Sequence, residues 1–422
     1  MSPSLSLSRR ISGNALIKLA SELAGRVATF ALALLAARRL SEGDFGFYNY
    51  GLAVGFVIAQ LADMGLQVLI AREVAARGRS AQPLVRQAFL VKVFLSVPVI
   101  LLLLVVGNGR TPQVQAAILL LGLAMLLQTF LEFAVYVFRG QQNLQEEARM
   151  MVFARLLVAA IGGAVLILGG GLVGLGLSTL VAQLVAVTWA YWRLWHLGWL
   201  NRHHDDGARP WMWTRLFREA VPLGIAIILS ITYTRLSVFL LEFRLGAGAV
   251  AQYSAAHRLV EPAQIVPAAL IAAVFPAYTA ALQTNRQQAN RLGWITALLL
   301  GIGGVVLAAV FWLLAPFLIP FLYGDGFQES IQVLRYLGVS ALFAYVNFAL
   351  THYLIARGQQ LLSSIFVGVM LIVHFLLSWL LIPSLREAGP ALSIIVAEFL
   401  LFVCCLVALR AAPPKTLTVK KN

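Results

Sequence analysis

Apolar runs long enough to cross a membrane recur along nearly the whole chain. A helix needs about 20 consecutive apolar residues to span the hydrocarbon core of a bilayer. These runs leave few polar stretches for a soluble domain, and charged residues make up only 12% of the 422 positions. In soluble domains, charged residues make up about 25% of the positions. The sequence therefore predicts an all-α polytopic membrane protein, because a transmembrane β-barrel would need alternating short strands instead.

Hydropathy predicts about twelve transmembrane helices. Their approximate limits are 12–37, 47–70, 84–106, 113–137, 150–169, 172–194, 217–241, 250–280, 292–322, 331–355, 361–382 and 389–410. The first apolar stretch carries charged residues, so we interpret it as a retained helix and not as a cleaved signal peptide. Prolines at 262, 267 and 276 predict that the 250–280 helix is kinked or broken.

The Lys and Arg residues at or beyond the ends of these spans are distributed unevenly. Twenty fall at one set of helix ends and five at the opposite set. Positive residues concentrate on the cytoplasmic side of membrane proteins, so both termini are expected to be cytoplasmic. The net charge of +15 follows largely from this topology. It also favours contact with anionic membrane lipids, and nothing in the sequence indicates a nucleic-acid partner.

The two halves of the chain resemble each other at three places in the same order, at offsets of 205, 218 and 215 residues. The pairs are Leu40–Tyr48 with Leu245–Tyr253, Arg139–Gln142 with Arg357–Gln360, and Gly174–Gln183 with Gly389–Glu398. Parallel six-helix repeats of this kind are typical of transporters, with a substrate site where the repeats meet. We therefore predict two pseudo-symmetric six-helix lobes around a central cavity.

The longest predicted loop divides these halves. We expect an N-terminal lobe over residues 1–195, a cytoplasmic linker over 196–216, and a C-terminal lobe with a basic tail over 217–422. The linker contains His203, His204, Asp205 and Asp206, but adjacent identical residues lack the spacing of a preformed ligand set. No metal site is predicted, and the neighbouring Cys404 and Cys405 are interpreted as small helix residues.

Seven basic residues fall inside the predicted spans by more than two residues from either end, and a charge costs about 2.5–3.5 kcal/mol at a helix centre. They are Lys18, Arg26, Lys92, Arg155, Arg235, Arg258 and Arg335. Lys92, Arg155 and Arg335 lie near helix ends and can extend toward the membrane surface. The deeper arginines must face protein or water, so they either pair with other helices or line a cationic cavity. Such a cavity suits an anionic headgroup, because guanidinium groups bind phosphate through two parallel hydrogen bonds.

Five acidic residues in the same spans are candidates either for pairing with these bases or for binding a coupling H⁺ or Na⁺. They are Glu22, Asp63, Glu132, Glu261 and Glu398. Glu22 lies one helical turn from Lys18 and one from Arg26, so all three share one face. His257, Arg258 and Glu261 form a second cluster in the eighth helix. No other cofactor is expected.

Several segments together resemble the polysaccharide-transporter (Wzx-type O-antigen flippase) branch of the MATE-like flippase superfamily, over roughly residues 10–410. The segments that carry the resemblance are Leu40–Gly46, Ala62–Leu66, Tyr253–Glu261, Phe275–Pro276 and Leu322–Phe327. The resemblance implies a V-shaped two-lobe bundle in the bacterial inner membrane. It also implies a flippase that moves undecaprenyl-pyrophosphate-linked oligosaccharide units by alternating access, alongside the polymerase and chain-length proteins of the same pathway.

The family contributes basic residues from the first helices of each lobe to its central cavity. The resemblance therefore assigns binding of the substrate headgroup to Arg26 and Arg258, and by extension to Arg235 and Lys18. A lipid II flippase usually has fourteen helices, and this chain is too short for two more.

Three alternatives remain at this stage. A MATE-like drug antiporter is related, although a basic cavity favours an anionic substrate. The major facilitator superfamily also has twelve helices, but Asp63-Met64-Gly65 is followed here by Leu66-Gln67, without that superfamily's basic pair. A glycan polymerase or ligase would need a large periplasmic loop, and no phosphate-binding loop or nucleophile–base motif supports an enzyme.

Overall fold

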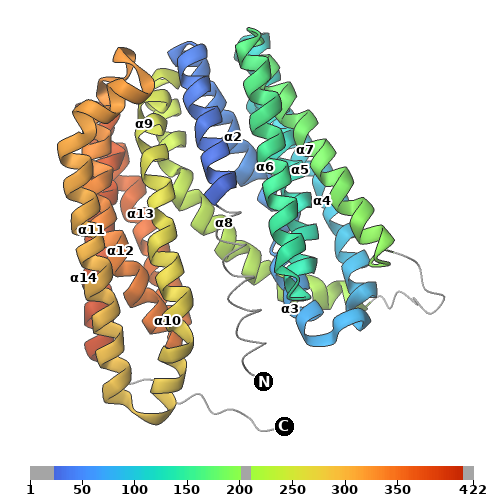
Figure 1. Cartoon of the computed structure of the whole chain (residues 1–422), viewed down its shortest axis with the longest axis vertical. Helices are drawn as coiled ribbons and strands as arrows, with labels where there is room; N and C mark the ends of the chain where they lie inside the picture. Colours follow the sequence, from blue (N-terminus) through green and yellow to red (C-terminus); the bar gives the residue numbers. More distant parts are fainter. Residues whose placement is uncertain (1–22, 201–210, 412–422) are drawn as a thin grey trace, which may run out of the picture. The chain divides into compact units, whose positions relative to one another are not determined.

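The computed structural model describes residues 23–200 and 211–411, and within them every regular element is a helix (Figure 1). A first helix is described over residues 23–39. The helices that follow are α2 (Glu42–Asp63), α3 (Leu66–Arg77), η1 (Gly78–Ala81), α4 (Gln82–Val106), α5 (Pro112–Gly140), α6 (Leu144–Ile167), α7 (Gly171–His196), α8 (Trp211–Leu245), α9 (Ala247–Val260), η2 (Glu261–Gln264), α10 (Ile265–Thr284), α11 (Arg286–Tyr323), η3 (Asp325–Phe327), α12 (Glu329–Ala356), α13 (Gln360–Leu385) and α14 (Ala388–Ala411).

Eleven helical segments in the described part of the chain are long and apolar enough to span a membrane. Two of these segments join consecutive elements, namely α3 with α4 and α9 with α10. Together with the helix over residues 23–39, they account for the twelve predicted helices. The all-helical polytopic fold is therefore confirmed.

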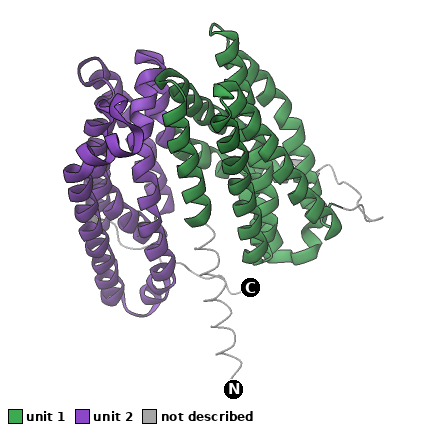
Figure 2. Ribbon diagram, turned by 45° about the horizontal axis from the view of Figure 1, so that its top comes forward, with its two compact units in different colours: residues 1–232 green, residues 233–422 purple. Residues whose placement is uncertain are grey.

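The chain divides into two compact units, residues 1–232 and 233–422 (Figure 2). The division falls inside α8, so this helix contributes its first part to unit 1 and its last part to unit 2. Ten of the residues in the predicted linker, 201–210, lie outside the described residues. The predicted domain limits of 1–195 and 217–422 stay a prediction.

The second predicted helix was placed wrongly at 47–70. α2 ends at Asp63 because the next two residues adopt left-handed backbone conformations, with φ of 44° at Met64 and 82° at Gly65. α3 then starts at Leu66 as a separate helix. At the other end, Ser41 caps α2, since its hydroxyl accepts a hydrogen bond from the Asp44 amide at 3.1 Å.

The predicted break in the proline-rich eighth helix is confirmed. α9 ends at Val260, and the 3₁₀ turn η2 separates it from α10. Pro262 lies in the first turn of η2, where its missing amide hydrogen removes no helical bond. Pro276 lies inside α10, which continues to Thr284.

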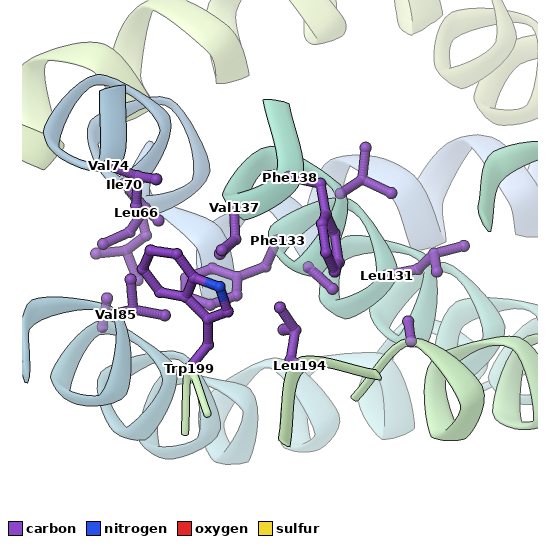
Figure 3. Close-up of a cluster of buried hydrophobic side chains, with 14 of the residues drawn as sticks. Leu66, Ile70, Val74, Val85, Leu131, Phe133, Val137, Phe138, Leu194 and Trp199 are labelled. Atoms are coloured by element: carbon purple, nitrogen blue, oxygen red, sulfur yellow. The ribbon is translucent and has the colours of Figure 1, made fainter. Parts of the chain in front are cut away.

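Unit 1 has a hydrophobic core that extends beyond the last turn of α7 (Figure 3). Trp199, which follows that turn, is 2% exposed and packs in one cluster with Leu66 and Val85 of α3 and α4. Arg79 donates to the Leu197 carbonyl, and the Gln82 amide donates to the Gly198 carbonyl at 3.1 Å. These contacts fix the end of α7 against the turn between α3 and α4.

Unit 2 has its own core, formed mainly by α10, α11, α12 and α14. Tyr278 of α10 is fully buried and packs its ring against Tyr353 of α12, with 5.3 Å between ring centroids. The Tyr353 hydroxyl in turn donates to the Asn290 side chain of α11 at 2.6 Å. An edge-to-face aromatic contact and a hydrogen bond thus connect three helices of this unit.

Candidate functional site: charged residues inside the membrane helices

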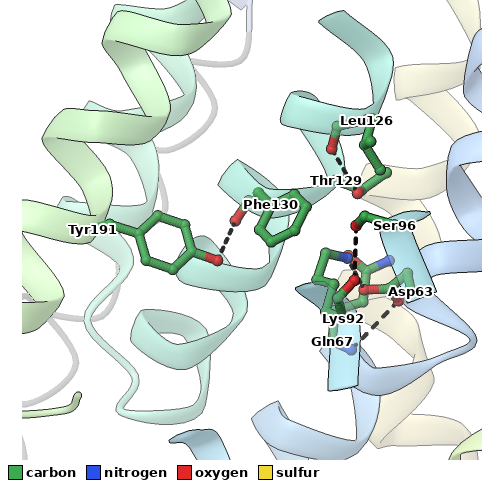
Figure 4. Close-up of polar contacts among 8 residues, drawn as sticks. All are labelled: Asp63, Gln67, Lys92, Ser96, Leu126, Thr129, Phe130 and Tyr191. Atoms are coloured by element: carbon green, nitrogen blue, oxygen red, sulfur yellow. Dashed lines mark hydrogen bonds and ion pairs between the residues drawn. The ribbon is translucent and has the colours of Figure 1, made fainter. Parts of the chain in front are cut away.

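Unit 1 contains an ion pair that is closed off completely from its surroundings (Figure 4). Lys92 Nζ of α4 lies 2.5 Å from Asp63 Oδ1 at the end of α2, and both side chains have no exposed surface. Phe130 and Phe133 of α5 present their rings to the ammonium group, at 5.4 and 6.0 Å from their centroids. The interpretation that Lys92 extends toward the membrane surface is therefore wrong, because its charge is neutralised inside the unit.

The break after α2 sets up this pair. Because α2 stops at Asp63, the carboxylate lies at the helix end, and its second oxygen accepts a longer hydrogen bond of 3.4 Å from the Gln67 amide of α3. Within α4, the Ser96 hydroxyl donates a hydrogen bond of 2.7 Å to the backbone carbonyl of Lys92. Asp63 and Lys92, which lie separately inside two predicted spans, thus form one ion pair inside unit 1.

A second polar contact in unit 1 joins α5 to α7. Glu132 accepts a hydrogen bond from Gln128 at 3.0 Å, and Gln128 accepts one from Gln183 of α7 at 2.8 Å. The donor to the Glu132 carboxylate is thus an uncharged amide. A carboxylate held in this way can gain or lose a proton without breaking an ion pair.

The other predicted residues of unit 1 are partly described. Arg26 is half-buried in the helix over residues 23–39. On the preceding residue, a Cβ added to Gly25 would come within 2.6 Å of the Arg155 side chain of α6, so Arg155 packs across this helix. Lys18 and Glu22 lie outside the described residues.

Unit 2 holds the second predicted cluster at the junction of α9 and η2. Glu261 lies 3.4 Å from Arg235 of α8 and 3.9 Å from His257 of α9. Arg258 is half-buried beside them in sequence. One carboxylate thus contacts both Arg235 and His257. Arg26 belongs to unit 1 and the other two arginines to unit 2, so the prediction that they share one cavity stays a prediction.

Glu398 of α14 lies in a separate polar contact of unit 2. It accepts hydrogen bonds from the Asn347 amide of α12 at 2.7 Å and from the Tyr233 hydroxyl of α8 at 3.1 Å. Both donors are uncharged. Glu398 and Gln183 are matching positions of the internal repeat, and each is bonded to the fourth helix of its own half, α12 or α5.

Sequence reasoning missed a buried histidine in the same unit. His374 of α13 has no exposed surface, and both of its ring nitrogens are within hydrogen-bond distance of serine hydroxyls. Nδ1 lies 2.6 Å from Ser393 of α14, and Nε2 lies 3.2 Å from Ser237 of α8. Ser378, one turn along α13, lies 2.6 Å from Ser393. The spacing of His374 and Ser378 was the available signal, because it places two polar groups on one helix face.

Arg335, the third base assigned to a helix end, lies on the surface. Its Nε donates to the Trp312 carbonyl of α11 at 3.2 Å, and its guanidinium lies over the Trp312 ring. In the described part of the chain, no three His, Cys, Asp or Glu side chains come together in a way that could hold a metal ion.

The helical arrangement resembles that of solved MATE transporters and of a lipid II flippase. An inward-facing multidrug resistance MATE transporter matches with a TM-score of 0.77 at 16% identity, covering 94% of this chain and 98% of that one. The lipid II flippase MurJ in an inward closed conformation matches with a TM-score of 0.73 at 12% identity, covering 94% and 88%. A mutant of a Vibrio cholerae MATE transporter matches with a TM-score of 0.58 at 17% identity, covering 96% and 98%.

Comparison of the sequence with protein families gives a more specific result than the structural matches. A family model described as "Polysaccharide biosynthesis protein" matches residues 11–283, and the chain belongs to this family. No curated protein sequence matches. Of these structural neighbours, one is named as a flippase and two as MATE transporters.

Proposed function

We propose that this protein is a flippase that moves undecaprenyl-pyrophosphate-linked oligosaccharide units, of an O-antigen or another exopolysaccharide, from the cytoplasmic to the periplasmic leaflet of the inner membrane. The observation that carries the proposal is the cluster around Glu261, where Arg235 and His257 contact the carboxylate inside membrane-spanning helices and Arg258 follows His257 in sequence. A charge in such a place is costly unless it is used. A pyrophosphate group provides the complementary negative charge.

The family name and the fold support the same reading. The family is described by polysaccharide biosynthesis, and one structural neighbour is named as a flippase of lipid II. In our proposal the sugar and pyrophosphate pass through the protein by alternating access, both chain termini are cytoplasmic, and the polymerase and chain-length proteins of the same pathway receive the product.

We further propose that an H⁺ or Na⁺ gradient drives transport through carboxylates that form no ion pair with the described residues. Glu132 and Glu398 fit this role, because their hydrogen bonds come from uncharged side chains. Asp63 fits it less well, since Lys92 already neutralises it. Glu261 is assigned to the headgroup cluster, where it holds Arg235.

The test uses a strain that lacks this gene, in which we expect the surface glycan to be lost. Wild-type protein should restore the glycan, whereas Arg258→Gln should not, and single repeat units should then accumulate on the cytoplasmic leaflet. Arg291→Gln is the matched control, because Arg291 is an exposed residue of α11. Protein amount in the membrane is measured for each variant, so that loss of function is separated from loss of protein.

Two results would contradict the proposal. Normal glycan export by Arg258→Gln would remove the headgroup assignment. Repeat units that reach the periplasmic leaflet without this protein, and merely fail to polymerise, would point to a polymerase or ligase. A MATE-like drug antiporter is the second candidate, favoured by the match to a multidrug transporter. It predicts increased drug sensitivity and unchanged surface glycan in the same strain.

A further inference from the structure

A groove lies along the outer face of α6 near its N-terminal end. Its volume is about 600 Å³, and it is lined by Gln145, Ala148, Arg149, Val152, Phe153, Leu156 and Trp189. Six of these residues belong to α6, and Trp189 of α7 closes one side with its ring centroid 5.0 Å from that of Phe153. All of them belong to unit 1.

The groove changes from polar to apolar along the helix. Gln145 and Arg149 form one end, and Phe153 and Leu156 form the other. At 1.5 Å per residue, Leu156 lies about 10 Å further along the helix axis than Arg149. A molecule that fills the groove therefore needs a polar group at one end and an apolar chain of at least this length.

The groove opens toward the part of α6 that faces the membrane. Only 28% of the apolar span of α6 is buried inside the protein. Phe153 and Leu156 are 38% and 47% exposed. On α7, Trp192 and Trp195 are exposed near the same end as Arg193, and tryptophan is enriched where a helix crosses the membrane–water interface. The occupant must therefore enter from the lipid phase.

The charges at the polar end do not balance. Arg149 and Arg193 both contact the same carboxylate oxygen of Glu146, each at 3.1 Å. The neighbouring carboxylate, Glu147, lies 2.7 Å from Arg139. The group of Arg149, Arg193 and Glu146 thus has one positive charge in excess, and the Arg149 side chain is 65% exposed. A single phosphodiester carries the one negative charge that would neutralise it.

We propose that this groove is a binding site for an anionic phospholipid of the membrane, with the phosphodiester at Arg149 and an acyl chain against Val152, Phe153 and Leu156. The site is separate from the headgroup cluster of unit 2, and the proposal does not depend on the flippase function. It predicts that the protein retains anionic lipid through purification and prefers it to zwitterionic lipid.

The experiment measures lipid binding to the purified full-length protein by native mass spectrometry, with phosphatidylglycerol and phosphatidylcholine as probes. Wild-type protein should prefer phosphatidylglycerol. A basic residue near a membrane surface contributes roughly 1 kcal/mol of attraction to anionic lipid, which is about a fivefold change in affinity. Arg149→Gln should lose this preference by about that factor, and Arg291→Gln should keep it.

A second variant tests the apolar part of the site without changing charge. Val152→Trp fills the groove and should weaken binding of both lipids, while the preference that remains still depends on Arg149. Equal binding by wild type and Arg149→Gln would overturn the proposal. So would equal affinity for the two lipids, or stronger binding of a polyprenyl pyrophosphate at this site. If the groove joins two copies of the chain instead, Val152→Trp will convert a dimer to a monomer, and this outcome also overturns it.

Discussion

Removing Lys92 should destabilise unit 1 more than any other change of a single basic side chain considered above. The Lys92→Met variant keeps most of the side-chain volume but leaves the Asp63 carboxylate inside the protein without its cation. Asp63 has no exposed surface, and its other described contact is a 3.4 Å hydrogen bond from the Gln67 amide. The variant therefore tests whether the ion pair stabilises the unit or is merely tolerated.

The expected magnitude follows from this complete burial. Breaking a buried ion pair by removing one partner costs about 3–5 kcal/mol, because an uncompensated charge remains. For a folding unit of 150–250 residues, each 1 kcal/mol shifts the unfolding midpoint by about 2–4 °C. Unit 1 comprises residues 1–232. Lys92→Met should thus lower the midpoint by about 6–20 °C.

Thermal unfolding of the purified protein in detergent, followed by loss of the monodisperse peak in size-exclusion chromatography, measures this shift. The double variant Lys92→Met/Asp63→Asn should recover most of the loss, since no charge is left unpaired. Arg149→Gln is the control, because the Arg149 side chain is exposed and Glu146 keeps its contact with Arg193; loss of such a surface arginine costs about 0–1 kcal/mol. The ion pair does not stabilise unit 1 if Lys92→Met unfolds within 2 °C of wild type, or if the double variant is no more stable than the single one.

Two further predictions concern packing and topology. Gly224→Ala should destabilise the protein by about 1–3 kcal/mol, because a Cβ there would lie 2.4 Å from the backbone of the break after α2. Gly368→Ala is the control and should cause no such loss, since the space around its Cβ is open. The unfolding midpoints of the two variants are compared, and similar midpoints would contradict the close approach at Gly224. In a background without the two native cysteines, Gln113→Cys should react with an impermeant thiol reagent added outside whole cells, and Gln141→Cys only after lysis. The reverse labelling pattern would overturn the cytoplasmic assignment of the termini.

The number and type of helices could be predicted from the sequence because apolar runs in a membrane protein are long and well separated. The break after α2 could not, since Met64 and Gly65 lie within an apolar run that has no proline. Nothing in hydropathy distinguishes a glycine that continues a helix from one with φ of 82°. The proline break at 262 was predictable because proline cannot donate a backbone hydrogen bond in a helix interior, so a helix usually ends before it.

The charged residues were recognised singly, but their partners were not. Lys92 and Asp63 are 29 residues apart and belong to different helices, so their contact depends on how α2 and α4 pack. The recurrence of Gly174–Gln183 as Gly389–Glu398 was more informative than it first appeared. Ser178 and Ser393, at matching positions, each donate to the carbonyl three residues earlier, at 2.9 and 2.8 Å. Of these two serines, Ser393 in the second repeat also contacts a histidine, His374.

The buried ion pair also imposes an order on how the protein enters the membrane during synthesis. Asp63 leaves the ribosome 29 residues before Lys92, an interval of about 1.5–6 s at 5–20 residues per second. During that interval the lysine that neutralises the Asp63 carboxylate in the folded unit has not yet been synthesised. We therefore expect stable insertion of α2 to wait for α4, and the two helices to enter the lipid together. A ribosome-bound chain that stops before Lys92 would leave α2 held at the channel.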